Sequence, residues 1–252
     1  MSSALQGLRI LNTRPKNQAP ALSEEIRQAG GIAVECPLLE IQAMSSDWLD
    51  LIPSLTTIQQ ALFISVNAVH HCFSALRQHN RHWPSSIKVT AIGLSTAKAL
   101  AQYGVSVHHL PEFFDSEHVL MLDSLHGLKN QNILLVKGVD GRTLIEHTLT
   151  LRGANVIPLV VYQRIMPHIS AQLIHSLWRD NQVDIILLTS EQSLNHLFKL
   201  FGTTAHDWLR EKTYLVISER LAKAALSFGI KKIIMSHPHR MIATLLDSNI
   251  KD

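Results

Sequence analysis

The chain has 252 residues, of which 46% are apolar and 17% are charged. This composition is typical of a folded protein with a large core and excludes a disordered chain, and the length predicts two α/β domains of about 100 to 130 residues each. Because the formal net charge is only +3 and no run of Lys or Arg exceeds Lys231-Lys232, we expect no nucleic-acid partner.

The cysteines and the N-terminal residues indicate where the protein acts. Cys36 and Cys72 are too few and too widely spaced for a disulfide framework, so we expect two buried thiols. Residues 1–9 lack the basic and apolar regions of a signal peptide, and no apolar run reaches about 18 residues. The sequence therefore predicts a cytoplasmic protein with no membrane segment.

Short apolar strands alternate with amphipathic helices along the whole chain, a pattern typical of parallel sheets that helices cover on both faces. We therefore expect an α/β fold. The expected strands are 8–12, 32–41, 61–64, 87–92, 105–110, 132–137, 155–164, 183–188 and 213–217. One helix is expected at 47–55. The others are expected to begin at Asn67, Ser116 and Ser190 or to end at Gly30, Gly104, Gly229 and near Gly153.

Two of the expected strands carry a proline near the middle. Pro37 lies in 32–41 and Pro158 lies in 155–164. Since proline cannot donate a hydrogen bond to a neighbouring strand, each strand should lie at a sheet edge or bridge two bodies. We expect the two strands to form a hinge between two domains, with Tyr162 over the cleft.

The second half of the chain repeats the order of the first. Residues expected at the starts and ends of helices recur at a nearly constant spacing. Ser65 and Ser190, Gly93 and Ser218, and Gly104 and Gly229 are each 125 residues apart, and Gly30 and Gly153 are 123 apart. So many coincidences predict a tandem duplication of a β/α unit.

The residues that follow the strands are rich in hydroxyls, glycines and single cations. Ligands of open α/β sheets bind outside the carboxyl ends of strands, where helix N-termini attract anions. Taken singly, each serine or asparagine here is better explained as a helix cap, and each arginine as a surface charge. Their shared position favours a cleft that binds several carboxylates. The candidates are Arg14, Ser65, Asn67, Gly93, Ser95, Thr96, Lys137, Gly138, Arg142, Thr189, Ser190, Ser218 and Arg220.

Several familiar sites are not predicted. No segment matches the glycine-rich loops that bind dinucleotides or nucleoside triphosphates, and neither Ser65 nor Ser190 lies in the G-x-S-x-G elbow of a hydrolase. The paired histidines, such as His70-His71, point apart on a helix or strand and lack further ligands. We therefore expect no metal.

Six short motifs, in order and spacing, resemble the uroporphyrinogen-III synthase family over about residues 8–246. They are Thr13-Arg14-Pro15, Phe63–Val69, Ile92–Ala97, Lys137-Gly138-x-x-Gly141-Arg142, Val160-Val161-Tyr162 and Leu188-Thr189-Ser190. The resemblance implies two α/β domains, 1–37 with 165–252 and 42–155, joined by a two-stranded linker of 38–41 and 156–164.

The resemblance also implies a substrate and a reaction. The substrate is hydroxymethylbilane, a linear tetrapyrrole with acetate and propionate arms, and the product is uroporphyrinogen III, an intermediate of porphyrin and heme biosynthesis. Water is lost, a spiro intermediate forms at ring D, and the ring closes inverted. No cofactor is implied, and we expect a monomer that contacts hydroxymethylbilane synthase transiently.

Tyr162 matches the family tyrosine that assists departure of the hydroxyl, and a phenol is protonated at neutral pH. Two positions depart from the family: Leu221 replaces a threonine, and Lys137 replaces an arginine and loses its bidentate geometry. These departures leave open a synthase-like protein that binds tetrapyrroles or other polyanions without turnover. A hinged domain for an unrelated small ligand is a third possibility.

Overall fold

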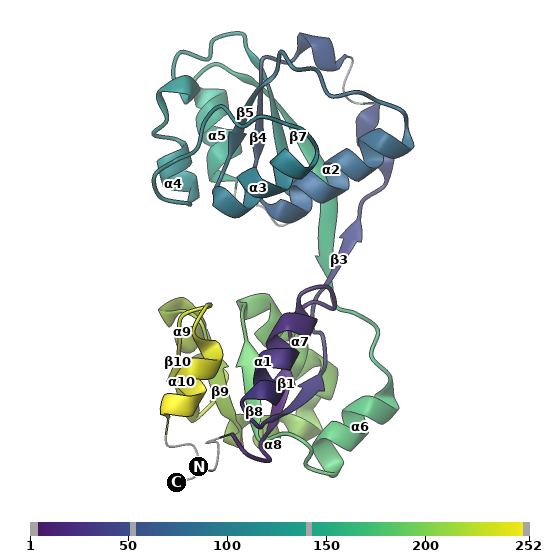
Figure 1. Ribbon diagram of the computed structural model, residues 1–252, viewed down its shortest axis with the longest axis vertical. Coiled ribbons are helices and arrows are strands. Elements are labelled where there is room, and N and C mark those ends of the chain that lie inside the picture. The colour runs from purple at the N-terminus through teal and green to yellow at the C-terminus, as the bar shows by residue number, and fades with distance from the viewer. Residues whose placement is uncertain (1–4, 51–53, 140–142, 249–252) are drawn as a thin grey trace. The chain divides into compact units, whose positions relative to one another are not determined.

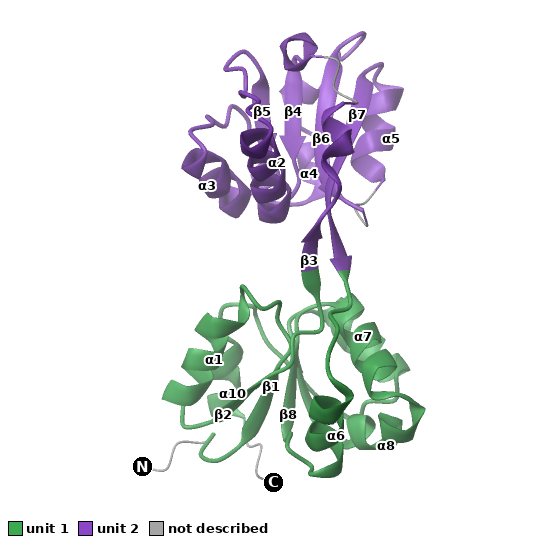
Figure 2. Ribbon diagram, turned by 90° about the vertical axis from the view of Figure 1, so that its right-hand side faces the viewer, with its two compact units in different colours: residues 1–40, 165–252 green, residues 41–164 purple. Residues whose placement is uncertain are grey.

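The computed structural model describes residues 5–50, 54–139 and 143–248. The chain divides into two compact units, unit 1 with residues 1–40 and 165–252 and unit 2 with residues 41–164 (Figure 2). Each unit is built on a five-stranded sheet with helices packed against it (Figure 1). The α/β class expected from the sequence is confirmed.

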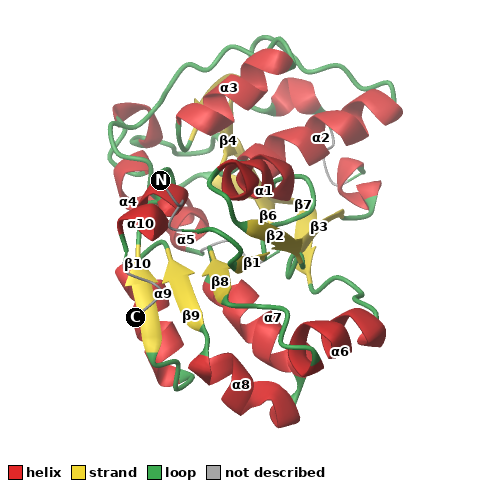
Figure 3. Ribbon diagram, turned by 60° about the horizontal axis from the view of Figure 1, so that its bottom comes forward, coloured by secondary structure: helices red, strands yellow, loops and turns green. Residues whose placement is uncertain are grey.

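The sheet of unit 1 has the strand order β10-β9-β8-β1-β2, and all of its neighbouring strands are parallel (Figure 3). Its strands are β1 Arg9–Asn12, β2 Ile32–Glu35, β8 Ile185–Leu188, β9 Thr213–Val216 and β10 Lys232–Met235. Its helices are α1 Ala19–Gln28, α6 Ala171–Arg179, α7 Glu191–Phe201, α8 His206–Glu211, α9 Glu219–Ser227 and α10 Met241–Asp247, and the 3-10 turn η4 spans Thr203–Ala205.

The sheet of unit 2 has the order β3-β7-β6-β4-β5. Its strands are β3 Glu40–Ala43, β4 Gln60–Phe63, β5 Lys88–Ala91, β6 Asn132–Gly138 and β7 Asn155–Ile165. Its helices are α2 Val66–Gln78, α3 Leu94–Gln102, α4 Ser116–Val119 and α5 Leu144–Leu151, and its 3-10 turns are η1 Ser46–Leu49, η2 Leu55–Thr57 and η3 Asp123–Leu125.

Both faces of each sheet are buried, as the short apolar strands require. In unit 1, Ile186 and Leu188 belong to the core on one face, and their neighbours Ile185 and Leu187 belong to the core on the other. All four side chains are fully buried. Because successive side chains of a strand point to opposite faces, a strand covered on both sides must be apolar throughout.

The duplication inferred from the sequence is present in the register of the sheets. Ile10 of β1 lies opposite Ile185 of β8. The equivalent of Ile10 in the second repeat is Ile133, 123 residues later, and the equivalent of Ile185 in the first repeat is Gln60, 125 residues earlier. Ile133 and Gln60 lie opposite each other in β6 and β4. Two further strand pairings have equivalents in the other unit. Arg9 pairs with Ile32 as Asn132 pairs with Asn155, and Ile185 pairs with Thr213 as Gln60 pairs with Lys88.

Each unit contains one half of the first repeat and one half of the second. The first repeat places β1 and β2 in unit 1 and β4 and β5 in unit 2, whereas the second places β6 and β7 in unit 2 and β8 to β10 in unit 1. The chain passes between units after Glu40 and again after Arg164, which are 124 residues apart. Each core is therefore made by both repeats.

The two proline-bearing strands differ from the expectation. Residues 32–41 are two strands, β2 of one sheet and the start of β3 of the other, because the chain leaves the first sheet around Pro37. The second, β7, pairs with β6 through Tyr162 and is therefore part of the sheet of unit 2. Beyond Tyr162, the Gln163 side chain donates a hydrogen bond to Gln42 of β3.

Several other local expectations were wrong. Two 3-10 turns replace the helix expected at 47–55, of which residues 51–53 lie outside the described structure. The strand expected at 105–110 is reduced to one bridge, between His109 and Thr90. Ser65 and Asp115, rather than Asn67 and Ser116, accept the capping hydrogen bonds of their helices. Among the described residues, the helices α6, α8 and α10, the strand β10 and the 3-10 turns η3 and η4 were not expected.

Both cysteines are buried free thiols, as expected. Burial raises the pKa of Cys36 to about 12, so this thiol is protonated and unreactive at neutral pH. No helix in the described part of the chain is long and apolar enough to cross a bilayer.

An ion pair joins the two repeats inside unit 1. Asp184 accepts hydrogen bonds from the Arg9 Nη2 at 2.7 Å, Nε at 3.0 Å and backbone N–H at 2.8 Å. Burial raises the pKa of Asp184, but these hydrogen bonds outweigh burial and hold the pKa below the usual value of a carboxyl group.

We expect Asp184→Asn to lower the free energy of unfolding by about 1–2 kcal/mol at pH 7, because a charged acceptor is lost. Since the folded-state pKa is depressed, the stabilisation is complete above the unfolded pKa and disappears as the pH falls through the folded pKa. Urea unfolding of both proteins between pH 3 and 7 measures the difference. A difference that stays constant down to pH 3 would contradict the assignment.

Candidate functional site

Two predicted site residues meet at the carboxyl ends of the strands of unit 2. Ser65 follows β4, and Tyr162 lies near the end of β7. The Tyr162 hydroxyl lies 3.1 Å from Ser65 Oγ, within hydrogen-bond distance. The same Oγ accepts a hydrogen bond from the Ala68 N–H at 3.0 Å and so caps helix α2. The phenol is thus linked to the N-terminus of a helix.

The Tyr162 ring is enclosed by unit 2. Its residue is 4% exposed and belongs to the core on one face of the sheet. The His71 ring stacks on it with centroids 5.8 Å apart, and the Arg164 guanidinium lies 5.8 Å from its centroid. Burial, followed by the charge of His70, lowers the pKa of His71, so its imidazole is neutral at pH 7.

Gly138 makes room for this ring. The register between β6 and β7 shifts at Lys137 and Gly138, and Gly138 lies opposite Tyr162. A Cβ atom at position 138 would lie 2.6 Å from Tyr162 Cζ, which is closer than atoms can approach. The missing side chain of Gly138 therefore lets the Tyr162 ring pack onto the strand within unit 2.

A pocket of about 390 Å³ lies beside Ser65, at the ends of β4 and β5. It brings together four of the predicted residues: Ser65, Gly93, Ser95 and Thr96. Gly93 is the N-cap of α3 and has no side chain to cap it, so first-turn N–H groups of this helix remain for a ligand. The exposed side chains of Leu94 and Phe114 form an apolar wall.

Lys137 does not reach this pocket as a free cation. Its residue is 8% exposed, and its Nζ lies 2.5 Å from Glu146 Oε2 on α5. Lys137 therefore neutralises a carboxylate of the protein, which corrects the expectation of a ligand-binding cation. Arg142, Gly141 and Asp140 lie outside the described residues.

The predicted residues of unit 1 have local partners. Ser190 and Ser218 each cap the helix that follows, α7 and α9. Arg14 Nη2 donates to Gln18 Oε1 at 3.1 Å, and the exposed Arg220 pairs with Glu191 at 2.8 Å. Leu221, which replaces the family threonine, is 2% exposed and packs in the core.

The structure also shows candidates that the sequence did not. A pocket of about 500 Å³ at the ends of β9 and β10 is lined by Ser218 together with Ser236, His237 and Arg240. The sequence did not predict the last three, because the four residues of β10 are too short a pattern to indicate a strand. His71 was missed because its role depends on Tyr162, a residue 91 positions away in the sequence.

No group of three or more His, Cys, Asp or Glu residues that could hold a metal ion occurs in the described ranges 5–50, 54–139 and 143–248.

Comparison with known proteins agrees with this arrangement. A family model described as Uroporphyrinogen-III synthase HemD matches residues 20–245. The chain belongs to this family. The uroporphyrinogen-III synthases of Salmonella typhimurium (strain LT2) and Escherichia coli (strain K12) are each 32% identical to it over 228 residues, which cover 89% of this chain and 93% of each relative. Family membership confirms the expected enzyme class, in tetrapyrrole biosynthesis.

Solved structures of the family share the fold. A mutant uroporphyrinogen III synthase from the extremely thermophilic bacterium Thermus thermophilus superposes with a TM-score of 0.66 over 96% of this chain and 97% of that chain. The synthase of Helicobacter pylori 26695 gives 0.61 over the same shares. Both are 17% identical in sequence, so these two comparisons support the fold alone.

We expect Gly138→Ala to destabilise the protein by about 1–3 kcal/mol, because the new methyl group overlaps the Tyr162 ring. In a Tyr162→Leu background the same change should cost much less, and urea unfolding of the four proteins gives the coupling. Equal costs of Gly138→Ala in both backgrounds would contradict the packing.

Proposed function

We propose that this protein converts hydroxymethylbilane into uroporphyrinogen III, with loss of water, closure of the macrocycle and inversion of ring D. The family match over residues 20–245 is the observation that carries the proposal. The site supports it, because the acetate and propionate arms of this substrate suit helix N-termini and hydroxyls at strand ends.

The reaction requires positioning more than a strong catalyst. The pyrrole nitrogens expel the hydroxyl group themselves, so a modest general acid suffices and no cofactor is needed. Because the bilane also closes spontaneously to the uninverted ring, the enzyme must hold it in the conformation that leads to inversion. Binding of several carboxylate arms at fixed helix ends provides that restraint.

Tyr162 is the proposed acid, and Ser65 orients it. Ser65 Oγ accepts from the Ala68 N–H, so its own proton is available for the Tyr162 oxygen at 3.1 Å. The phenol can then accept from Ser65 and donate its proton to the departing hydroxyl. Hydrogen bonds in such a chain polarise one another, which strengthens the last donor.

The proposed contacts to the substrate arms follow from the strand ends. In unit 2 they are Ser65, Asn67, Gly93, Ser95 and Thr96, and in unit 1 they are Arg14, Thr189, Ser190, Ser218 and Arg220. Lys137 and Gly138 act from inside unit 2, by neutralising Glu146 and by seating Tyr162. A contact from Arg142 stays a prediction.

The proposal includes the setting of the reaction. We infer a cytoplasmic monomer that receives its substrate through a transient contact with hydroxymethylbilane synthase. Membership of a family of biosynthetic enzymes supports this setting. Sedimentation of the purified protein tests the monomer, and sedimentation with the upstream enzyme tests the contact.

A tetrapyrrole-binding protein without turnover is the second candidate. The observation that favours it is Leu221, which stands 125 residues after Thr96 and places an apolar side chain where the other repeat has a hydroxyl. Both candidates bind tetrapyrroles, so only the product distinguishes them.

Incubation with freshly made hydroxymethylbilane, followed by separation of the oxidised product isomers, tests the proposed function. We expect the type III isomer to predominate, because the enzyme must outpace spontaneous closure. Formation of the type I isomer alone, at the rate seen without protein, would show that the protein does not catalyse the reaction.

Tyr162→Phe removes the phenolic proton and keeps the ring that packs on Gly138. We expect kcat to fall by about 10²-fold, the lower range for a general acid, while the affinity for uroporphyrinogen III changes little. Unchanged kcat would remove Tyr162 from the mechanism.

Ser65→Ala is compared with Ser170→Ala, a serine cap of helix α6 that has no place in the proposed site. Each change removes a helix cap, so each should lower the free energy of unfolding by about 1 kcal/mol. Only Ser65 contacts the phenol, so only Ser65→Ala should lower kcat as well. An equal kcat in the two variants would show that Ser65 does not orient Tyr162.

A further inference from the structure

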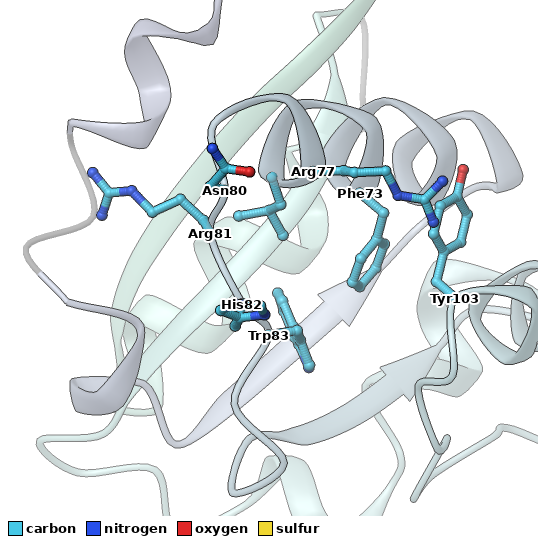
Figure 4. A pocket seen from close by; sticks show the side chains of 8 residues that line it. Phe73, Arg77, Asn80, Arg81, His82, Trp83 and Tyr103 are labelled. Carbon is cyan, nitrogen blue, oxygen red and sulfur yellow. The ribbon is translucent and has the colours of Figure 1, made fainter.

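Unit 2 has a second pocket at the opposite end of helix α2 from Ser65. Its volume is about 340 Å³, and it lies where α2 ends and the chain turns toward β5 (Figure 4). Phe73, Trp83 and Tyr103 form its aromatic floor, and Arg77, Arg81 and His82 lie at its rim. Nothing in the proposed reaction uses this pocket.

The three aromatic rings of the floor pack against one another and remain accessible on the pocket side. The Phe73 ring lies 5.2 Å from Trp83 and 5.0 Å from Tyr103, measured between centroids. The Arg77 guanidinium lies 5.6 Å from the Tyr103 centroid, above the ring (Figure 4). Trp83 and Tyr103 are only half-buried, so each ring keeps accessible surface.

The surrounding sequence is free of acidic residues. Residues 51–111 contain no Asp or Glu, but they contain four Lys or Arg and six His residues. The equivalent residues of the second repeat, 176–236, contain six Asp or Glu residues. Among the described residues, no carboxylate forms an ion pair with Arg77 or Arg81.

The second repeat shows that the fold does not require this pocket. Trp83, Tyr103 and Phe73 correspond, 125 residues later, to Trp208, Phe228 and Phe198. In unit 1 the segment that follows α7 folds into η4 and α8, and it buries Ala205 and Leu209 fully in the same core as Phe198. In unit 2 the equivalent segment contains no helix, and the aromatic floor stays accessible.

The end of helix α2 explains only part of the positive charge at the rim of the pocket. Arg77 lies in the last turn of α2, where a cation offsets the partial negative charge of the free carbonyls. That effect does not explain Arg81 and His82, which follow the end of the helix and line the same pocket.

We propose that this pocket is a second binding site, which takes a planar aromatic anion. The ring of the ligand packs on Trp83 and Tyr103, its acid group lies against Arg77, and Arg81 adds positive charge on the other side of the pocket. A pocket of this volume suits one small ring system with an acid group and not a whole macrocycle. A nucleotide and a monopyrrole with carboxylate arms share this chemistry.

Calorimetric titration of the full chain with AMP and with a monopyrrole dicarboxylate tests the proposal. We expect at least one of them to bind and to bind more tightly than adenosine or inorganic phosphate, which each lack half of the recognised chemistry. The tighter of the two anions identifies the source of the ligand. Binding should weaken as salt is raised, because the rim is exposed.

The variant Arg77→Gln/Arg81→Gln should bind the preferred anion at least about tenfold more weakly, the effect of about 1.4 kcal/mol. The control is Arg179→Gln, which removes an arginine that lies 4.5 Å from the Trp178 ring outside the pocket. We expect the control to bind as the original protein does. Both variants should retain cyclisation of hydroxymethylbilane, so this test is independent of the proposed function.

Three results would overturn the proposal. One is no heat of binding for either anion at millimolar concentration. Another is equal affinity for AMP and adenosine when AMP is the preferred anion. The third is unchanged affinity in the double arginine variant.

Discussion

The structure depends on the parallel pairing of strands that come from different repeats. β1 lies beside β8 in unit 1 and β6 lies beside β4 in unit 2, with equivalent registers. Each pairing joins half of one repeat to half of the other, so neither repeat has a complete core of its own. The chain must pass between units twice, after Glu40 and after Arg164. Pro37 suits the first passage, because a strand that leaves its sheet no longer needs every backbone donor.

The site in unit 2 is formed by this pairing. Ser65 belongs to the first repeat, whereas Gly138 and Tyr162 belong to the second. The hydrogen bond between the two hydroxyls therefore exists only when the halves have been exchanged and assembled. Position 138 requires glycine, since even a methyl group there would overlap the Tyr162 ring. A buried phenol held by a helix cap is well oriented as a donor, which is what a reaction controlled by positioning needs.

The repeats have kept their backbone and changed their surfaces. Gly93 and Thr96 line a pocket in unit 2. In unit 1 the equivalent Ser218 also lines a pocket but caps helix α9, and the equivalent of Thr96, Leu221, packs in the core. The segment after α2 leaves an aromatic floor accessible, and the segment after α7 covers its own. Because the strands fix the core and the connections do not, changes of function can accumulate at helix starts and in the turns.

The sequence by itself determined the fold class, the repeat and the family, and it predicts a site at the strand ends. These features follow from local patterns, namely apolar strands, caps and motifs at fixed spacing, which are legible without contacts. The sequence did not determine that 32–41 divides between two sheets, that Lys137 neutralises Glu146, or that Tyr162 lies on Gly138 against Ser65. Only the tertiary structure decided these, because each depends on which residues, dozens of positions apart, become neighbours across the strands. Short elements such as β10 and α8 were also decided there, since packing against a formed core stabilises segments whose own patterns are too short to recognise.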